Sequence, residues 1–318
     1  MRVLVSTSLF VLALGCQPQS ELEFQHLSTM KAKTQGLVLM DDGQVGHAGM
    51  AGTTCRFDTL NGWLIDDFDL PTREERVLDT LRGKVLGTND EGLYEVKALD
   101  FTPAEHVTEG RYLRGGELVW LQGEGASCSV AYSDGDVVPV SGTLCEAGPD
   151  AVSVVRDDGA VVVGTADETV VVDGSGAEHF ADAADFVVYD PATGLVYLAQ
   201  KGERTVRAVD LDGMPVWSTE LPGRIQAMTR LGSRGKVVAM ITTDDEDRMV
   251  VIDGPSGEQE LGTETPSADV ELEASEDGST LAVVLPREIY FFDVVADGEE
   301  PKKRKTLGAE DQRPTFSD

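Results

Sequence analysis

The second half of the chain repeats one pattern four times: a glycine turn, a strongly apolar run, a polar turn, and a β-branched run that ends in Asp. The turn glycines are separated by 35, 41 and 43 residues, at Gly159, Gly194, Gly235 and Gly278. The closing aspartates are separated by 37, 43 and 40 residues, at Asp173, Asp210, Asp253 and Asp293. Short β-branched runs bounded by Gly, Asp and Pro are typical of strands. The pattern therefore predicts a β-strand repeat with a period of about 40 residues.

The repeat extends toward the N-terminus, where Gly43, Gly83 and Gly116 occupy equivalent turn positions. A period of about 40 residues with four short strands in each unit is typical of a β-propeller blade. One four-stranded sheet cannot bury both of its faces, whereas sheets stacked around an axis bury them against one another. We therefore expect an all-β β-propeller over residues 36–297 with seven four-stranded blades, one for each turn glycine.

Six or eight blades are the alternatives, because the first unit, around residues 37–64, follows the pattern poorly. A β-sandwich or a long solenoid is the rival architecture, but a sandwich does not account for this repeat period. In a propeller the apolar second strands are expected to be the buried ones, at residues 161–163, 196–198, 237–240 and 281–285.

One segment, residues 71–82, has helical features. Pro71 lies where the first turn would be, and Val77, Leu78 and Leu81 have the spacing of one helix face. A short helix is therefore predicted in this segment of an otherwise β-rich chain.

The N-terminus carries Arg2 followed by an apolar stretch over residues 3–14. This stretch is shorter than the roughly 20 residues that span a bilayer as a helix, and it matches the hydrophobic part of a secretory signal. The run Ala13-Leu14-Gly15-Cys16 resembles the lipobox of bacterial lipoproteins. The alternative is an ordinary secreted protein whose signal ends near a cysteine.

The lipoprotein resemblance implies that a signal peptide, residues 1–15, is removed and that Cys16 is lipidated. Two or more acyl chains hold a protein stably on a membrane. Residues 16–35 would then be a lipidated tether, and Gln17, in place of Asp, implies the outer membrane of a Gram-negative source.

Three further cysteines, Cys55, Cys128 and Cys145, would lie in an oxidising compartment. We favour a disulfide between Cys128 and Cys145, which are 17 positions apart, because a loop of that size contributes about 3 kcal/mol. Cys55 would then be a buried free thiol, although its pairing with either of the other two remains open.

The net charge of −31 repels nucleic acid phosphates and attracts cations or basic partners, so no nucleic acid partner is expected. The last residues, 298–318, have few apolar side chains and predict a flexible C-terminal tail. This tail contains a basic run at 302–305 that either contacts an anionic partner or acts as part of a linker.

The sequence contains no recognisable pattern of catalytic residues, and no cofactor is predicted. The four histidines, His26, His47, His106 and His179, are not paired at metal-ligand spacing. Ca²⁺ is the one metal considered, because it takes six to eight oxygen ligands. The clustered acids are Asp66, Asp67 and Asp69, then Asp134 and Asp136, then residues 244–247. None has the order of an EF-hand loop, so solvated turns are the favoured interpretation and any bound metal stays unknown.

One blade, AVDLDGMPVWSTEL at residues 208–221, resembles the repeats of PQQ-type quinoprotein propellers and of the outer-membrane assembly lipoprotein BamB. The other units resemble propeller repeats of the WD type only in general form. The matching positions are Asp210, Gly213 and Trp217. In those families the Trp docks between blades, so the resemblance implies a packing role.

Together these features favour a lipid-anchored envelope propeller that acts as a protein-interaction or scaffold module and is not an enzyme. The alternatives are a metal-dependent propeller enzyme, lactonase-like or quinoprotein-like, and a cation or small-ligand sensor. An enzyme would need carboxylates or histidines that converge from several blades, and the sequence shows acids without such a pattern.

Overall fold

The computed structural model describes residues 22–29, 37–40, 43–50, 53–58, 64–69, 76–82, 84–89, 92–95, 101–113, 115–124, 127–155, 159–265, 270–285 and 288–294. These residues form 28 strands and three short 3-10 turns. Within them, no helix has the length and apolar character needed to cross a membrane. The predicted signal peptide, Cys16 and the tail 298–318 lie outside the described residues.

The strands form seven four-stranded antiparallel sheets. The first two contain β2 (Leu37–Leu39), β3 (Val45–Met50), β4 (Thr53–Asp58) and β5 (Leu64–Asp69), then β6 (Arg76–Leu81), β7 (Lys84–Asn89), β8 (Gly92–Glu95) and β9 (Phe101–Pro103). The next two contain β10 (Val107–Tyr112), β11 (Leu118–Glu124), β12 (Ser127–Tyr132) and β13 (Val137–Val140), then β14 (Val152–Val154), β15 (Val161–Gly164), β16 (Glu168–Asp173) and β17 (Gly176–Asp182).

The remaining three sheets complete the series. Two contain β18 (Phe186–Asp190), β19 (Leu195–Ala199), β20 (Thr205–Val209) and β21 (Pro215–Glu220), then β22 (Arg224–Arg230), β23 (Lys236–Thr242), β24 (Asp247–Asp253) and β25 (Gln259–Thr265). The last contains β26 (Glu271–Ala274), β27 (Thr280–Val284), β28 (Glu288–Val294) and, at its outer edge, β1 (Leu22–Thr29).

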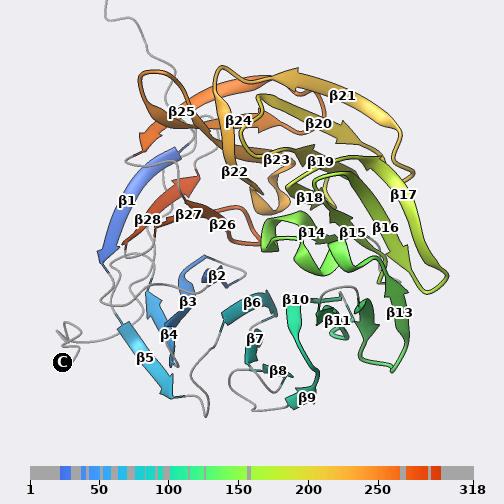
Figure 1. Ribbon diagram of the computed structural model, residues 1–318. Coiled ribbons are helices and arrows are strands. Elements are labelled where there is room, and N and C mark those ends of the chain that lie inside the picture. The colour runs from blue at the N-terminus through green and yellow to red at the C-terminus, as the bar shows by residue number, and fades with distance from the viewer. Residues whose placement is uncertain are drawn as a thin grey trace, which may run out of the picture.

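The sheets are arranged as a closed ring (Figure 1). Each first strand contacts the first strand of the next sheet in the order β2, β6, β10, β14, β18, β22, β26 and back to β2. These seven strands are the inner strands of the ring and surround a central channel. The expected all-β β-propeller with four-stranded blades is confirmed.

The last sheet is built from both ends of the chain, because β1 pairs antiparallel with β28 from Leu22 opposite Val294 to Thr29 opposite Glu288. The expectation that residues 16–35 form a tether is therefore wrong for Leu22–Thr29, which is a strand of the propeller. The physical reason is that β28 would otherwise present a row of unpaired backbone N–H and C=O groups at the ring's edge.

The predicted helix over residues 71–82 is also wrong, because Arg76–Leu81 is the inner strand β6. A register shift between Val77 and Asp79 marks a β-bulge in this strand. The bulge lets two consecutive residues, Val77 and Leu78, both be buried, at 4% and 8% exposure. It therefore breaks the alternation that identifies a strand and leaves apolar spacing that imitates a helix.

The turn glycines that the structure describes lie where the repeat placed them, between the first and second strands of their sheets: Gly43, Gly116, Gly159, Gly194, Gly235 and Gly278. Gly83 lies outside the described residues. Gly278 has a φ of 67°, and a Cβ at this position would lie 2.4 Å from the carbonyl oxygen of Leu231 in the preceding sheet. The second strands are buried as expected: residues 161–163, 196–198, 237–240 and 281–284 are at most 3% exposed. Burying each such Val or Leu contributes about 1.5–3 kcal/mol. Leu285, which the expected range included, is only partly buried.

Candidate functional site

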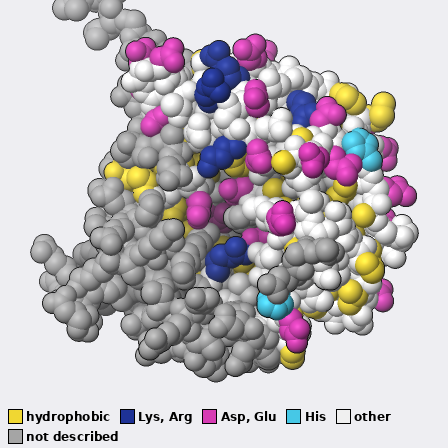
Figure 2. Space-filling model, in the orientation of Figure 1, with side chains coloured by type: hydrophobic (Ala, Val, Ile, Leu, Met, Phe, Trp, Pro, Cys, Tyr) yellow, Lys and Arg dark blue, Asp and Glu magenta, His cyan; other side chains and the backbone are white. Residues whose placement is uncertain are grey.

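A cavity of about 650 Å³ opens on the face of the ring where the inner strands begin. Its wall comes from the 3-10 turns η1 (Gly142–Glu146) and η2 (Pro149–Ala151), the turn between β15 and β16, and the starts of β18, β22 and β26. The charged side chains in this wall are Glu146, Asp150, Asp167, Asp185, Lys201 and Glu271. Figure 2 shows carboxylates and basic side chains around the hollow at the centre of this face.

A disulfide holds η1 in place. Cys128 on β12 is bonded to Cys145 in η1, with a Cα–Cα distance of 5.7 Å, and both cysteines are buried. The pairing is the one that the sequence favoured. Because η2 follows η1 directly and contacts β18 and β22 as well as β15, the bond helps to fix the segment that carries Asp150 across the ring.

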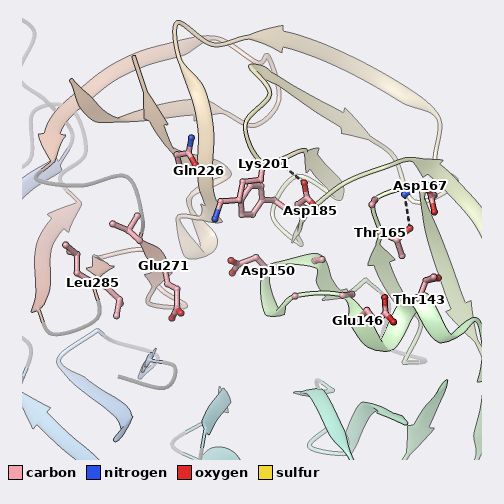
Figure 3. Close-up of a pocket in the computed structure, with 18 residues that line it drawn as sticks. Thr143, Glu146, Asp150, Thr165, Asp167, Asp185, Lys201, Gln226, Glu271 and Leu285 are labelled. Atoms are coloured by element: carbon pink, nitrogen blue, oxygen red, sulfur yellow. Dashed lines mark hydrogen bonds between the residues drawn. The ribbon is translucent and has the colours of Figure 1, made fainter. Parts of the chain in front are cut away.

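Asp150 is the most perturbed carboxyl in the cavity. Burial, together with the negative charge of Glu271, raises its pKa to about 6, although Arg111 and Lys201 lower it. Among the described residues, no group donates a hydrogen bond to the Asp150 carboxyl. Figure 3 shows Asp150, Glu271 and Lys201 pointing into the same open space from different elements.

The opposite wall is held by local hydrogen bonds. The backbone N–H of Lys201 donates to Asp185 Oδ2 at 2.8 Å, which ties the loop after β19 to the start of β18. Thr165 Oγ1 donates to the carbonyl oxygen of Glu168 at 2.8 Å and accepts from the backbone N–H of Asp167 at 3.3 Å. These bonds fix the backbone that carries the Asp167 and Asp185 carboxylates.

A buried charge network lies on the inner strands. Glu109 on β10 is 1% exposed, and it accepts hydrogen bonds from Arg76 Nη2 at 2.5 Å and from Arg111 Nη1 at 2.8 Å. Asp79 on β6 accepts from the backbone N–H groups of Thr80 and Tyr112 at 2.8 and 2.7 Å. A carboxylate as buried as that of Glu109 needs such hydrogen bonds from its partly exposed arginine partners to offset the cost of desolvation.

A β-bulge immediately precedes each of two of these carboxylates, Asp79 and Glu109. The register shifts between Val77 and Asp79 in β6 and between Val107 and Glu109 in β10, so each acid follows an extra residue. A bulge bends its strand and changes the direction of the side chain that follows it. The same irregularity occurs in β22 between Ile225 and Ala227, which flank the cavity-lining Gln226.

Two acids and one arginine in this region carry raised pKa values. Burial raises the pKa of Glu273 on β26 to about 8, with a further contribution from Asp79, against lowering by Arg111. Burial also raises the pKa of Asp79, while Arg111 lowers it. Burial alone would lower the pKa of Arg111, but Glu109 and Asp79 outweigh it and raise that pKa. Together with Asp150, these groups couple the cavity electrostatically to the channel.

The arrangement overturns one expectation from the sequence, that the acids do not converge. Carboxylates from five inner-strand regions, at β6, β10, η2, β18 and β26, meet at the channel and its mouth. Sequence reasoning missed Asp79, Glu109, Asp150, Glu271 and Glu273. What these acids share is their position, because each lies in or next to an inner strand. The sequence could have identified them only if the inner strands had already been assigned.

The acid clusters that the sequence singled out do not come together. Asp134 and Asp136 share a turn in which Asp134 Oδ1 accepts from the Asp136 backbone N–H at 3.1 Å. Residues 244–247 lie at the turn between β23 and β24, in another sheet. The third cluster, Asp66, Asp67 and Asp69, is on β5, where only the backbone is described. Within the described part of the chain, no group of three metal-ligating side chains is assembled.

The histidines are dispersed as well. His106 and His179 are exposed, and His179 Nδ1 lies 3.2 Å from Glu168 Oε2. His47 is buried in β3 at 2% exposure. His26 lies in β1 and Cys55 in β4, where the side chains are outside the described residues.

The residues of the quinoprotein-like blade have contacts between sheets. Asp210 Oδ1 accepts from the backbone N–H groups of Asp212 and Met214 at 3.0 and 2.8 Å, which shapes the turn before β21. Gly213 has a φ of 77°, and a Cβ there would lie 2.2 Å from the carbonyl oxygen of Phe180 in the preceding sheet. Trp217 Nε1 donates to the carbonyl oxygen of Gly254 in the following sheet at 2.7 Å. The motif thus contacts both neighbouring sheets.

No family model and no curated protein matches the chain. Solved structures match its fold. The β-propeller domain of Cps50 (Swd1) from Myceliophteria thermophila is 10% identical with a TM-score of 0.63, and the match covers 86% of this chain and 100% of that domain. A streptogramin B lyase is 12% identical with a TM-score of 0.62, and the match covers 86% of this chain and 97% of the lyase. At these identities the likeness establishes the fold alone: the chain is a β-propeller.

Proposed function

We propose that this protein is a lipid-anchored, non-catalytic β-propeller of the bacterial envelope that binds a protein partner at the acidic mouth of its channel. The observation that carries the proposal is the cavity of about 650 Å³ whose wall holds five carboxylates and one lysine from several sheets. A rigid ring that presents charged side chains from several blades on one face suits recognition of a complementary surface. The net charge of −31 favours a partner with a basic surface.

The anchoring part of the proposal rests on the lipobox-like run that ends in Cys16. β1 begins at Leu22, so residues 17–21 separate that cysteine from the ring. β1 starts on the face of the turn glycines, because it runs antiparallel to β28 and Leu22 lies opposite Val294. The start of β1 is thus on the face opposite the cavity, which supports an anchor at Cys16 that would leave the acidic mouth open to a partner.

The test is a pull-down from cross-linked envelope with the full-length protein as bait. The variant Asp150→Asn/Glu271→Gln removes two negative charges at the mouth. The matched control Asp212→Asn/Glu178→Gln removes two exposed charges outside the cavity wall. We expect one stoichiometric partner that is recovered with the wild type and the control and is lost with the mouth variant. Equal recovery with both variants would place partner binding elsewhere, and no stoichiometric partner would contradict the proposal.

A second candidate function is catalysis, and one observation favours it. Asp150 has a pKa near 6 inside a cavity, which is suited to acid–base chemistry, and one structure with the same fold is a lyase. Metal analysis of the purified protein, combined with turnover assays on lactones and cyclic esters with and without added Mg²⁺ or Ca²⁺, tests it. Turnover that Asp150→Asn abolishes would replace the binding proposal with an enzymatic one.

A further inference from the structure

Two opposite charges at the cavity, Asp150 and Lys201, form no hydrogen bond or ion pair through their charged groups with any described residue, although each feels the charge of the other. The Asp150 carboxyl accepts no hydrogen bond from any described residue. Lys201 uses its backbone N–H on Asp185, and its ammonium forms no ion pair among the described residues. Asp150 is half-buried and Lys201 is exposed at the edge of the cavity. A partly buried carboxylate without a hydrogen bond has lost hydration that the protein does not replace. A group kept in that state at the wall of a cavity is suited to a ligand that completes its hydrogen bonds.

The size of the cavity limits what that ligand is. A volume of about 650 Å³ lies within the range of about 300–1,000 Å³ typical of ligand pockets. It is too small for a folded domain and large enough for one or two side chains of a partner. The wall also contains the apolar side chains of Phe186, Val270, Val284 and Leu285, which can pack against the methylene stem of a long side chain.

The charge of the wall defines the chemistry of the ligand. Five carboxylates face one ammonium, so an anion would be repelled. An ion such as Ca²⁺ needs six to eight closely spaced oxygens, and no cluster of three metal-ligating groups is assembled in the described residues. An organic cation, by contrast, can bridge carboxylates that come from separate elements.

We propose that the cavity binds a lysine or arginine side chain of the protein partner, with the cationic head between Asp150 and Glu271. This inference rests on the proposed partner-binding function and assigns its chemistry. Figure 3 shows the two carboxylates pointing into one open space, with Lys201 at its edge. The bound cation neutralises the repulsion between the two acids, which the charge of Lys201 offsets only in part.

The electrostatics of the site make this binding sensitive to pH. The groups that act on Asp150 are Glu271, Arg111, Glu109 and Lys201. The pKa of Asp150 is about 6 because burial and Glu271 outweigh the cations, and a second cation beside it lowers that pKa. Binding therefore releases a proton when the pH is near 6 or below. Affinity should be constant above pH 7 and fall by up to about tenfold between pH 7 and pH 5.

The experiment is a titration of the purified protein with acetyl-Gly-Lys-Gly-amide and acetyl-Gly-Arg-Gly-amide, followed by NMR or calorimetry at pH 7.5 and pH 5.0. Acetyl-Gly-Gln-Gly-amide is the neutral control. We expect saturable binding of one cationic peptide per protein, weaker binding at pH 5.0, and no binding of the neutral peptide. Equal binding of all three peptides, or no binding at millimolar concentration, would overturn the inference.

Variants that are expected to change the affinity for the cationic peptide in opposite directions make the test more specific. Asp150→Asn should weaken cationic peptide binding about tenfold and remove its pH dependence, and Glu271→Gln should weaken it several-fold. Lys201→Gln should strengthen binding several-fold, because it removes the competing cation. Asp212→Asn, which lies outside the cavity wall, should leave binding unchanged. Melting temperatures verify that each variant is folded, and a Lys201→Gln variant that binds more weakly would contradict the proposed geometry.

The two proposals fail in distinguishable ways. If a partner is captured equally by the wild type and the mouth variant while the cationic peptides do not bind, this inference is wrong, and the protein binds its partner at a surface other than the mouth. If the peptides bind as expected but no stoichiometric partner is recovered from the envelope, the proposed function is wrong and the site binds a free organic cation instead.

Discussion

Single residues at the boundaries between sheets hold this ring together, and Trp217 is the most informative of them. Its ring lies 5.8 Å from that of Tyr197 between centroids, and its Nε1 donates to Gly254 in the next sheet. Gly257 approaches the same indole so closely that a Cβ there would lie 2.9 Å from it. The indole therefore joins two neighbouring sheets both by packing and by a hydrogen bond.

Trp217→Phe should lower the free energy of unfolding by about 1–2 kcal/mol, because the Gly254 carbonyl loses its donor while most of the packing is kept. Trp120→Phe is a matched control, since Trp120 Nε1 donates at 2.7 Å to Gln122 on the same strand and not across sheets. We expect a smaller loss for the control. Urea unfolding of both variants measures the difference, and a larger loss for Trp120→Phe would contradict the inter-sheet role.

Glu273 gives a prediction about pH. Its pKa is about 8 in the folded protein against an ordinary value of 4.5, so between these values the folded chain binds one more proton than the unfolded chain. Stability must then fall as the pH rises through this range, by up to about 1.4 kcal/mol for each pH unit. Glu273→Gln removes this dependence and keeps an acceptor for the Leu39 backbone N–H.

The measurement is urea unfolding of the wild type and Glu273→Gln at pH 5.5 and pH 7.5. The stability advantage of the variant should be larger at pH 7.5. Parallel changes of the two proteins with pH would show that the Glu273 carboxyl is not buried as the structure has it.

Among the elements, β1 has a role that its position in the chain does not suggest. It completes the sheet of β26, β27 and β28, so the first described strand and the last one are neighbours. In a ring each sheet buries its faces against two others, and an incomplete sheet exposes apolar surface on both sides. Closure by β1 therefore affects the cooperative stability of the whole ring more than the length of one strand indicates.

A chain that begins at residue 30 should unfold at a clearly lower urea concentration than a chain that begins at residue 22, or fail to stay monomeric, because the edge of β28 is exposed. Removal of residues 1–21 alone should leave the unfolding midpoint unchanged, since β1 is kept. Urea unfolding and size-exclusion chromatography of both truncations provide the test. Equal midpoints would show that β1 is dispensable for closure.

At the scale of the whole molecule, the ring has two structurally different faces. The face where the inner strands begin holds the cavity and its carboxylates, and the opposite face holds the turn glycines and the start of β1. A lipid at Cys16 would therefore turn the cavity away from the membrane. This orientation agrees with the repulsion expected between the acidic mouth and anionic lipid head groups.

Cys16→Ser should move the protein from the membrane fraction to the soluble fraction, because the attachment point for acyl chains is lost. Cys55→Ser is the control and should remain with the membranes. Fractionation of cells that express each variant, followed by immunoblotting, measures the distribution. If Cys16→Ser still sediments with membranes, the lipid-anchor proposal is wrong.

The repeat by itself determined the class of fold, the four-stranded unit and the position of each turn. It did so because turn glycines, β-branched runs and apolar second strands are local features that follow directly from backbone and side-chain chemistry. The Cys128–Cys145 bond and the inter-sheet position of Trp217 likewise agree with what spacing and resemblance indicated.

Only the tertiary structure decided how the ring closes and where its charges meet. The bulge in β6 gave its apolar residues a spacing typical of a helix, so the sequence did not predict a strand there. β1 pairs with β28 in the last sheet, although the two strands are near opposite ends of the chain. Asp79, Glu109, Asp150 and Glu273 are far apart in sequence and come together because the inner strands and η2 surround one axis. No local pattern records that proximity, since it arises from closing the ring and not from any segment alone.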